Sequence, residues 1–489
     1  MVPRVVAFGR RGLPVLGFAL RVVRSEGLVT GATIVCPDSN LLVEIPIPVG
    51  VLGFDHACVD LASCHGPFFH FREARIRRST ESQSYAGGMR LTVRPDRLVA
   101  GGEAMARDDD GRVVFVRGAL PGELVEVELS SAKKDFAKGT VAEVIEPSDD
   151  RIDPQCYHRR MGCGGCGWMH IDPFAQLEAK TEIVRESLRR IGRIDPDVVD
   201  GIVDMGASGE PFRYRTTIRV VGGPDGGLGF REEGSDTVVS VNSCEVAVQQ
   251  LSDLLPLLTI APGVEVTLRA SVNTGGITAR WAKPKGKAGT GLVSGIPEDV
   301  HIGDRGFLTE VVDGVVLRVS AGSFFQSGVG AAELLVDAVR RAAPEAATAR
   351  HAVDAYGGVG LFAATVLADV SKVTLLEQSK SSCFDAEHNL AGRDVAVIRG
   401  EVGKWAASDD QPVDLVIADP ARPGLGKPGV AALVTASPAP LVLVNCDPVS
   451  LARDVTLLAE HGYRPERVEV LDIFPQTHHV ETVTRFVAR

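Results

Sequence analysis

The sequence has 489 residues, of which 45% are hydrophobic and 24% are charged. This length exceeds one ordinary core, so about two to four domains are expected. No run of about 18 apolar residues is free of charge, which argues against a membrane span. The net charge of −11 does not suit a protein that coats DNA. It leaves RNA binding open, because attraction depends on the local field.

Near the N-terminus an apolar stretch, Gly12–Leu20, lies between arginines, as in a signal peptide. No small-residue cleavage site follows it, and charges recur at Arg24 and Glu26. We therefore expect a cytoplasmic protein.

Residues 1–88 differ in composition from everything downstream. They contain no lysine and show no sustained helical or strand period, and three cysteines are scattered through them: Cys36, Cys58 and Cys64. Met89 directly precedes the first clear strand pattern. We predict that residues 1–88 are an atypical extension, disordered or the product of a misassigned start, with translation beginning at or near Met89.

Residues 89–147 have an all-β pattern. Short apolar or alternating runs at Val113–Val116, Leu124–Leu129 and Thr140–Ile145 are separated by turn residues such as Pro121-Gly122. About five such strands in so short a segment predict a small OB-like barrel, a common platform for nucleic acid.

Residues 148–320 form a predicted central domain that begins with a cysteine cluster. Nine cysteines in a cytosolic-looking chain argue against a disulfide framework. Cys156, Cys163 and Cys166 lie close together among glycines, a spacing that indicates a metal or cluster site. A helix is expected at Pro173–Ile191. Strands follow within residues 211–245, up to Cys244, and a mixed, mostly β region continues to about Leu317.

Residues 321–489 alternate between helix and strand. The predicted elements are a helix at Ala331–Arg341 and then strands separated by helices, at Ala352–Ala355, Lys372–Glu377, Asp414–Ala418 and Leu441–Asn445. This alternation predicts a doubly wound, Rossmann-like parallel sheet.

A glycine-rich loop, Asp354–Gly360, follows the first of these strands and opens a helix. Such glycines let the backbone approach a ligand at the helix N-terminus. Glu377 ends the next strand, where it can accept hydrogen bonds from both ribose hydroxyls. Gly358 and Gly360 also fit a dinucleotide fingerprint, so a nicotinamide dehydrogenase is a rival on this loop alone.

Two features favour an S-adenosylmethionine-dependent methyltransferase over the dehydrogenase. Asp354 precedes the glycines, where methyltransferases commonly place a carboxylate near the amino-acid end of the ligand. Asp419-Pro420 follows the strand Asp414–Ala418, a frequent methyl-acceptor position in methyltransferases.

Cys446 comes directly after the strand Leu441–Asn445, at the edge of the sheet where α/β ligands bind. A lone cysteine after a strand is usually a packing residue. A helix starting near Ser450 would instead lower the pKa of this thiol through its N-terminal dipole and make Cys446 a candidate nucleophile.

The chain resembles the RNA uracil-5-methyltransferase family, the TrmA/RumA type with an N-terminal TRAM domain. The resemblance covers about residues 90–489 and rests on a set of short motifs: Phe324-Phe325-Gln326, the Asp354–Gly360 loop, Asp419-Pro-Ala-Arg-Pro-Gly424, Asn445-Cys446-Asp-Pro448 with Leu451-Ala-Arg-Asp454, and Phe474-Pro-Gln-Thr-His-His-Val-Glu481-Thr-Val.

This resemblance implies roles for individual residues. Cys446 would add to C6 of a uracil, and Glu481 would then remove the proton from C5, with His478 and His479 as supporting residues. Gln326, Tyr356, Glu377 and Asp419 would contact S-adenosylmethionine. Two positions depart from the family pattern: Gly357, where a cysteine is frequent, which looks harmless, and Ala421, where a proline is frequent, which bears on the rigidity of its loop.

The resemblance also implies a [4Fe–4S] cluster on Cys156, Cys163, Cys166 and Cys244, with zinc as the alternative. The interval between Cys156 and Cys163 is one residue longer than the family spacing. Cluster cysteines favour ribosomal RNA, most simply 23S rRNA, over transfer RNA. No membrane or obligate protein partner is implied.

Three rival functions remain beside this one. They are a tRNA uridine-5 methyltransferase, a catalytically silent RNA-binding maturation factor of the same fold, and a DNA cytosine-5 methyltransferase. The last would carry a Pro-Cys pair and a Glu-Asn-Val context, and neither stands at these positions.

Overall fold

The structure is a computed structural model that describes residues 89–282, 291–407, 412–436 and 440–488, together with the backbone of three earlier strands. The chain divides into two units, Met1–Ser82 and Gln83–Arg489. In the first unit, β1 (Ala19–Ser25), β2 (Leu28–Cys36) and β3 (Leu41–Pro46) form an antiparallel sheet.

The sequence of residues 1–88 shows no sustained strand period, yet three short strands lie within it. The strands have 7, 9 and 6 residues, so a search for sustained periods passes over them. The rest of this segment, where disorder was expected, lies outside the described residues. The start at Met89 stays a prediction.

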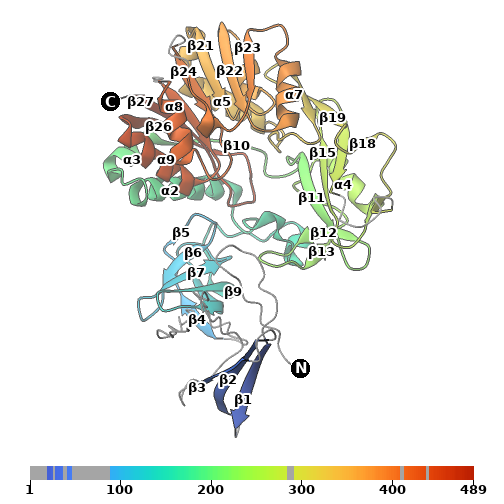
Figure 1. Cartoon of the computed structure of the whole chain (residues 1–489), viewed down its shortest axis with the longest axis vertical. Coiled ribbons are helices and arrows are strands. Elements are labelled where there is room, and N and C mark those ends of the chain that lie inside the picture. Colours follow the sequence, from blue (N-terminus) through green and yellow to red (C-terminus); the bar gives the residue numbers. More distant parts are fainter. Residues whose placement is uncertain are drawn as a thin grey trace. The chain divides into compact units, whose positions relative to one another are not determined.

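The second unit opens with a six-stranded β-domain in the order β4-β8-β9-β7-β6-β5 (Figure 1). Its strands are β4 (Arg90–Val93), β5 (Arg97–Leu98), β6 (Ala104–Arg107), β7 (Val113–Arg117), β8 (Leu124–Ala132) and β9 (Phe136–Glu146). Val114 and Val116 on β7 and Val125 and Val127 on β8 are fully buried, and their neighbours are more exposed. This period of two confirms the predicted small β-domain.

A helical segment begins within the cysteine cluster and continues beyond it. It contains α1 (Tyr157–Arg160), η1 (Gly164–Cys166), α2 (Pro173–Arg190) and α3 (Pro196–Ile202), and ends in β10 (Val203–Ser208). Helix α2 begins at Pro173 because the carboxylate of Asp172 accepts a hydrogen bond from the Phe174 amide at 2.9 Å. Strand β10 pairs with β26 (Tyr463–Asp472), so part of the predicted central domain belongs to the C-terminal sheet.

The central region is built on a sheet ordered β13-β12-β11-β15-β16-β18. Its strands are β11 (Thr217–Gly222), β12 (Leu228–Arg231), β13 (Val238–Ser240), β15 (Glu265–Ala270), β16 (Ile277–Trp281) and β18 (Val300–Ile302). The other elements are α4 (Gln249–Leu254), η2 (Leu255–Leu257), the pair β14 (Thr259–Ile260) and β17 (Val293–Ser294), and the hairpin β19 (Phe307–Val312) and β20 (Val315–Ser320).

The C-terminal sheet has eight strands in the order β10-β26-β27-β25-β24-β21-β22-β23. Its remaining strands are β21 (His351–Ala355), β22 (Lys372–Glu377), β23 (Val395–Arg399), β24 (Leu415–Ala418), β25 (Leu441–Asn445) and β27 (Glu481–Ala488). The helices are α5 (Ala331–Ala342), η3 (Pro344–Ala347), α6 (Leu361–Ala364), α7 (Lys380–Asn389), η4 (Val402–Lys404), α8 (Gly426–Val434) and α9 (Pro448–Glu460).

Strands β21 to β25 are mutually parallel, and both faces of their sheet are covered by helices. On β24, Ile417 packs into a core that includes residues of α5 and α7, whereas Val416 and Ala418 pack into a second core with α2, α8 and α9. Burial on both sides explains why these strands read as continuous apolar runs. The predicted doubly wound fold is confirmed.

None of the helices in the described part of the chain combines the length and the apolar character needed to cross a bilayer.

Candidate active site

The register of two antiparallel strands brings the candidate nucleophile and base together. Asn445, the last residue of β25, pairs with Thr482 on β27. Antiparallel pairing continued by one position puts Cys446 opposite Glu481. Glu481 is 3% exposed, and Cys446 keeps part of its surface accessible. A thiol and a carboxyl far apart in sequence thus meet at one edge of the sheet.

Three further carboxylates lie at the same edge. Asp419 directly follows β24, Asp354 is the fourth residue of β21, and Glu377 ends β22. The Asp354 carboxylate accepts a hydrogen bond from the Ala363 amide at 3.0 Å. The Glu377 carboxylate accepts hydrogen bonds from the Gly358 amide at 3.2 Å and the Ser379 amide at 2.5 Å. The carboxyl ends of parallel strands are where ligands bind in such sheets.

Burial and mutual repulsion make this edge unfavourable for negative charge. Burial raises the pKa of Asp354 to about 7, with repulsion from Asp419 and Glu377 adding to the effect. Burial likewise raises the pKa of Asp419 to about 7. The pKa of Glu481 lies well above its ordinary value because the residue is buried and faces Asp419. One oxygen of Asp354 also has no hydrogen-bond partner among the described residues. Such a set of buried carboxyls is suited to a cationic ligand.

The thiol of Cys446 differs from the expectation. Burial, followed by repulsion from Glu481 and Asp419, raises its pKa to about 12, and Arg422 only partly offsets this. Helix α9 does begin beside it, but the Asp447 carboxylate accepts the Ser450 amide hydrogen bond at 2.7 Å and caps that helix. The predicted low pKa of this thiol is therefore wrong, because burial and the two carboxyls outweigh any effect of the helix N-terminus.

Arg422 and His479 form a polar contact beside the thiol. The Arg422 guanidinium lies 3.2 Å from the ring nitrogens of His479. Burial and the charges of His478 and Arg422 lower the pKa of His479 to about 3, so its ring is neutral and can accept from Arg422. The rings of His478 and His479 are 4.4 Å apart. Arg422 was not singled out from the sequence, although it stands in the Asp-Pro-Ala-Arg motif.

The loop after Asp419 is held in place despite Ala421, where a proline is frequent in the family. The Gly424 amide donates to the Ala421 carbonyl at 2.9 Å. From α9, the Ser450 hydroxyl donates to the Arg422 carbonyl at 2.6 Å, and Asp454 accepts hydrogen bonds from the amides of Leu425 and Gly426 at 2.8 and 3.0 Å. These bonds supply the rigidity that the sequence left open.

The glycine loop is tightly fitted at one position and open at the next. A Cβ at Gly357 would lie 2.6 Å from a carbon of Leu375, so the packing of Leu375 in this chain requires glycine at this position. A Cβ at Gly358 would meet nothing within 4 Å, which leaves room for a ligand. Tyr356 has a left-handed backbone with φ of 61°, a strained conformation that such loops often keep at binding sites.

Tyr356 and Gln326 are two further residues that the resemblance predicts to contact S-adenosylmethionine. The Tyr356 hydroxyl faces Gly429 on α8, since a Cβ there would lie 2.9 Å from it. Gln326 is 8% exposed, and its side-chain oxygen has no hydrogen-bond partner among the described residues. Phe325, which directly precedes Gln326, is buried, whereas Phe324 is 70% exposed.

The four predicted cluster cysteines line one cavity of about 160 Å³. They are Cys156, Cys163, Cys166 and Cys244, and all are free thiols. Burial and the neighbouring Cys244 raise the pKa of Cys166 to about 12, whereas Arg215 opposes this. Among the described residues, no three His, Cys, Asp or Glu side chains are arranged to hold a single metal ion.

The fold and the carboxylate-lined edge define an S-adenosylmethionine-dependent methyltransferase. The TRAM domain family matches residues 89–142. A Streptomyces coelicolor protein described as an uncharacterized RNA methyltransferase is 33% identical over 78% of this chain and 89% of its own length. A Corynebacterium glutamicum protein of the same description is 31% identical over 83% of this chain and 99% of its own. The chain belongs to this family of RNA methyltransferases, as its resemblance to the RNA uracil-5-methyltransferases predicts.

Among solved structures, the chain is similar to a Pyrococcus abyssi tRNA (uracil-54, C5)-methyltransferase in complex with S-adenosyl-L-homocysteine. The TM-score is 0.61 and the identity 23%, over 82% of this chain and all of the other. This likeness establishes the fold.

Proposed function

We propose that the protein transfers a methyl group from S-adenosylmethionine to C5 of a uridine in RNA. The observation that carries this proposal is the pairing of β25 with β27, which sets Cys446 across from Glu481 at the ligand-binding edge. A nucleophile and a separate base in one site are what this reaction needs.

C5 of uracil is too weak a nucleophile to take a methyl group directly. The Cys446 thiolate adds to C6, and the electron pair of the C5–C6 bond moves to give an enolate. C5 then bonds to the methyl carbon as the carbon–sulfur bond of the sulfonium breaks. The Glu481 carboxylate removes the C5 proton, the C5–C6 double bond re-forms, and the thiolate leaves.

The carboxyl cluster suits S-adenosylmethionine, which carries a sulfonium and an ammonium. Asp354 and Asp419 are held partly protonated near neutral pH by burial, and one oxygen of Asp354 lacks a partner. Both groups gain by ionising beside a cation. Glu377 at the end of β22 would bind the ribose of the ligand. The open space over Gly358 would accommodate the side of the ligand that faces the backbone.

We also propose a [4Fe–4S] cluster on Cys156, Cys163, Cys166 and Cys244. When bound, such a cluster would link the four cysteines rigidly. Its role would be structural, since methyl transfer moves no electron. Four thiols around a shared cavity favour the cluster, because each cysteine of a cluster binds a different iron. Zinc is the alternative on the same four cysteines, because it too is bound by thiolates. The buried Arg215 beside Cys166 would balance the negative charge of the thiolates.

The RNA that carries the uridine is proposed to be ribosomal, because the cysteine set resembles that of the rRNA-directed members. Transfer RNA is the second candidate, because the solved structure of matching fold is named for a tRNA activity. In either RNA the target base must be splayed out, since the thiolate and the methyl donor lie on opposite faces of the ring.

The first test is incubation of the anaerobically purified protein with methyl-labelled S-adenosylmethionine and separated rRNA and tRNA. Label is expected in 5-methyluridine of rRNA with the wild type and with Cys383→Ser, a control that keeps a hydroxyl where the Cys383 thiol donates to the Glu377 carbonyl. Cys446→Ala should transfer nothing. Label in neither RNA would point to the silent maturation factor instead.

The second test concerns the base. Glu481→Gln should still form the thiolate adduct and methylate C5, but elimination should stall, so a slow-migrating covalent protein–RNA complex should accumulate. Continued turnover without that complex would exclude Glu481 as the base.

Iron and sulfide analysis of the same preparation tests the proposed cluster. Zinc without iron would overturn the cluster assignment.

A further inference from the structure

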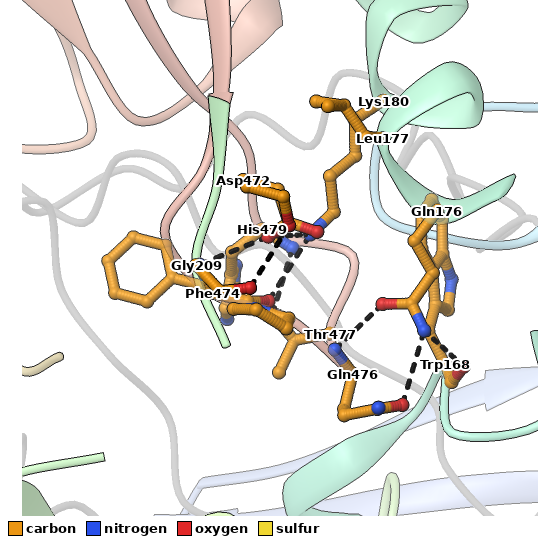
Figure 2. Close-up of polar contacts among 12 residues, drawn as sticks. Trp168, Gln176, Leu177, Lys180, Gly209, Asp472, Phe474, Gln476, Thr477 and His479 are labelled. Carbon is orange, nitrogen blue, oxygen red and sulfur yellow. Dashed lines mark hydrogen bonds and ion pairs between the residues drawn. The ribbon is translucent and has the colours of Figure 1, made fainter. Parts of the chain in front are cut away.

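The segment Phe474–Val480 makes up most of the loop between β26 and β27, and a buried ion pair between Lys180 of helix α2 and Asp472 holds it in place. The Lys180 ammonium donates to the Asp472 carboxylate at 2.6 Å and to the Phe474 carbonyl at 3.2 Å (Figure 2). The Lys180 and Asp472 side chains are 0% and 1% exposed. Asp472 is the last residue of β26 and also accepts a hydrogen bond from the Phe474 amide at 3.1 Å.

One turn earlier on α2, Gln176 grips the middle of the same loop. Its side-chain oxygen accepts from the Gln476 amide at 2.7 Å, and its nitrogen donates to the Gln476 side chain at 3.1 Å. Gln476 is fully buried and has φ of 66°. A glutamine keeps that left-handed backbone only where its surroundings fix it, and Gln176 supplies the fixing bonds.

The other side of the loop is tied to the cysteine segment and to the β-domain. The Trp168 amide donates to the Gln476 carbonyl at 3.0 Å, and its indole donates to the Gly102 carbonyl at 3.2 Å. A Cβ at Gly102 would lie 2.5 Å from His478. The conformation of Gln476 is therefore determined from both sides, by α2 and by Trp168.

Stability alone does not explain this arrangement, because burying charged and polar side chains costs free energy. Two charges and two amides are removed from water, where apolar side chains of similar volume often stabilise a protein as well or better. The polar groups form directional hydrogen bonds, and each bond fixes the position of one atom in a loop that ends at Glu481. The same loop carries His479, which faces Arg422 beside Cys446.

We propose that Lys180 and Gln176 are positioning residues that fix the Phe474–Val480 loop, so that the Glu481 carboxylate reaches the C5 proton of the acceptor base. The inference rests on the proposed function. Lys180 and Gln176 are distant from Cys446 and Glu481 in the sequence. They act by fixing the loop and do not act on the acceptor base directly.

The test uses Lys180→Met and Gln176→Leu in the full chain, with Glu178→Ala on the exposed side of α2 as the matched control. Hydrogen exchange of the loop amides should quicken about tenfold in both variants, the factor for one lost buried hydrogen bond. Exchange in β21 and the affinity for S-adenosylmethionine should stay as in the wild type. With RNA, kcat should fall and the covalent adduct should accumulate, as expected for Glu481→Gln.

A double variant, Lys180→Met with Asp472→Asn, separates positioning from stability. It removes both buried charges, so the melting temperature should recover towards the wild-type value while kcat stays low. Recovery of kcat together with the melting temperature would overturn the proposal, as would unchanged loop exchange in the single variants. If the wild type methylated no RNA, the proposed function would fall, whereas loop exchange would still decide whether α2 holds the loop.

Discussion

The affinity for S-adenosylmethionine should rise with pH, because the buried carboxyls that would face its cationic groups are half-protonated near neutrality. Burial raises the pKa of Asp354 and Asp419 to about 7. A group with that pKa is about 9% ionised at pH 6 and about 91% ionised at pH 8. If binding requires one such carboxylate, the dissociation constant should fall about tenfold over this range, or about 1.4 kcal/mol.

The stability of the unliganded protein should instead fall as the pH rises. The folded-state pKa values of Asp354 and Asp419 exceed their ordinary value of 3.8, so the folded chain binds more protons than the unfolded chain between about pH 4 and 7. Their contribution to the free energy of unfolding is therefore lost as the pH rises through this window. Bound S-adenosylmethionine should restore stability most at high pH.

Calorimetric titration of the protein at pH 6, 7 and 8 measures the first effect, and thermal melts with and without ligand measure the second. Asp419→Asn keeps the shape of the side chain and removes one of the two titrating groups, so it should weaken the pH dependence. A dissociation constant that stays within about twofold from pH 6 to 8 would refute the assignment of these carboxyls to the cationic ligand.

Three further outcomes follow from particular contacts. Cys446, with a pKa of about 12, should react with iodoacetamide at a rate that rises about tenfold per pH unit up to pH 10, and a plateau near pH 8.5 would contradict the burial argument. Gly357→Ala should lower the free energy of unfolding by about 1–3 kcal/mol in urea titrations, because its Cβ meets Leu375, and Leu375→Val should relieve part of that loss. Asp454→Ala should cost about 1–3 kcal/mol by removing the acceptor of two amides, whereas the exposed neighbour Arg453→Ala should change little.

Local sequence signals were sufficient for most of the C-terminal fold. The strands Lys372–Glu377 and Leu441–Asn445 have the predicted bounds, because each has an apolar centre that is bounded by polar residues or proline. Helix α9 begins two residues before the predicted Ser450, since Asp447-Pro448 supplies a cap and a first-turn proline. By contrast, β10 joins the C-terminal sheet by pairing with a strand far along the chain, which no local pattern reveals.

The electrostatics of the site could not be predicted in the same way. The expected low pKa of Cys446 relied on one neighbouring helix, whereas the structure adds Glu481 and Asp419 from two other strands. The positioning residues were missed for a related reason. Gln176 and Lys180 stand four apart among Leu177, Val184 and Leu188 on the buried face of α2. Polar residues on an apolar face were the available signal, but their partners became visible only in the fold.

The high pKa of Cys446 and those of the surrounding carboxyls have one common cause, which also indicates how the site would be switched on. In the unliganded protein, burial beside groups of the same charge sign favours the neutral form of each of these side chains. A cationic methyl donor reverses that condition: it stabilises carboxylates at Asp354 and Asp419, and its positive charge also favours the thiolate. Glu481 faces Asp419, which keeps its pKa high, so the Glu481 carboxylate, once ionised, would be a strong base for the C5 proton. The same burial would thus keep the nucleophile unreactive in the absence of the donor and keep the base strong in its presence.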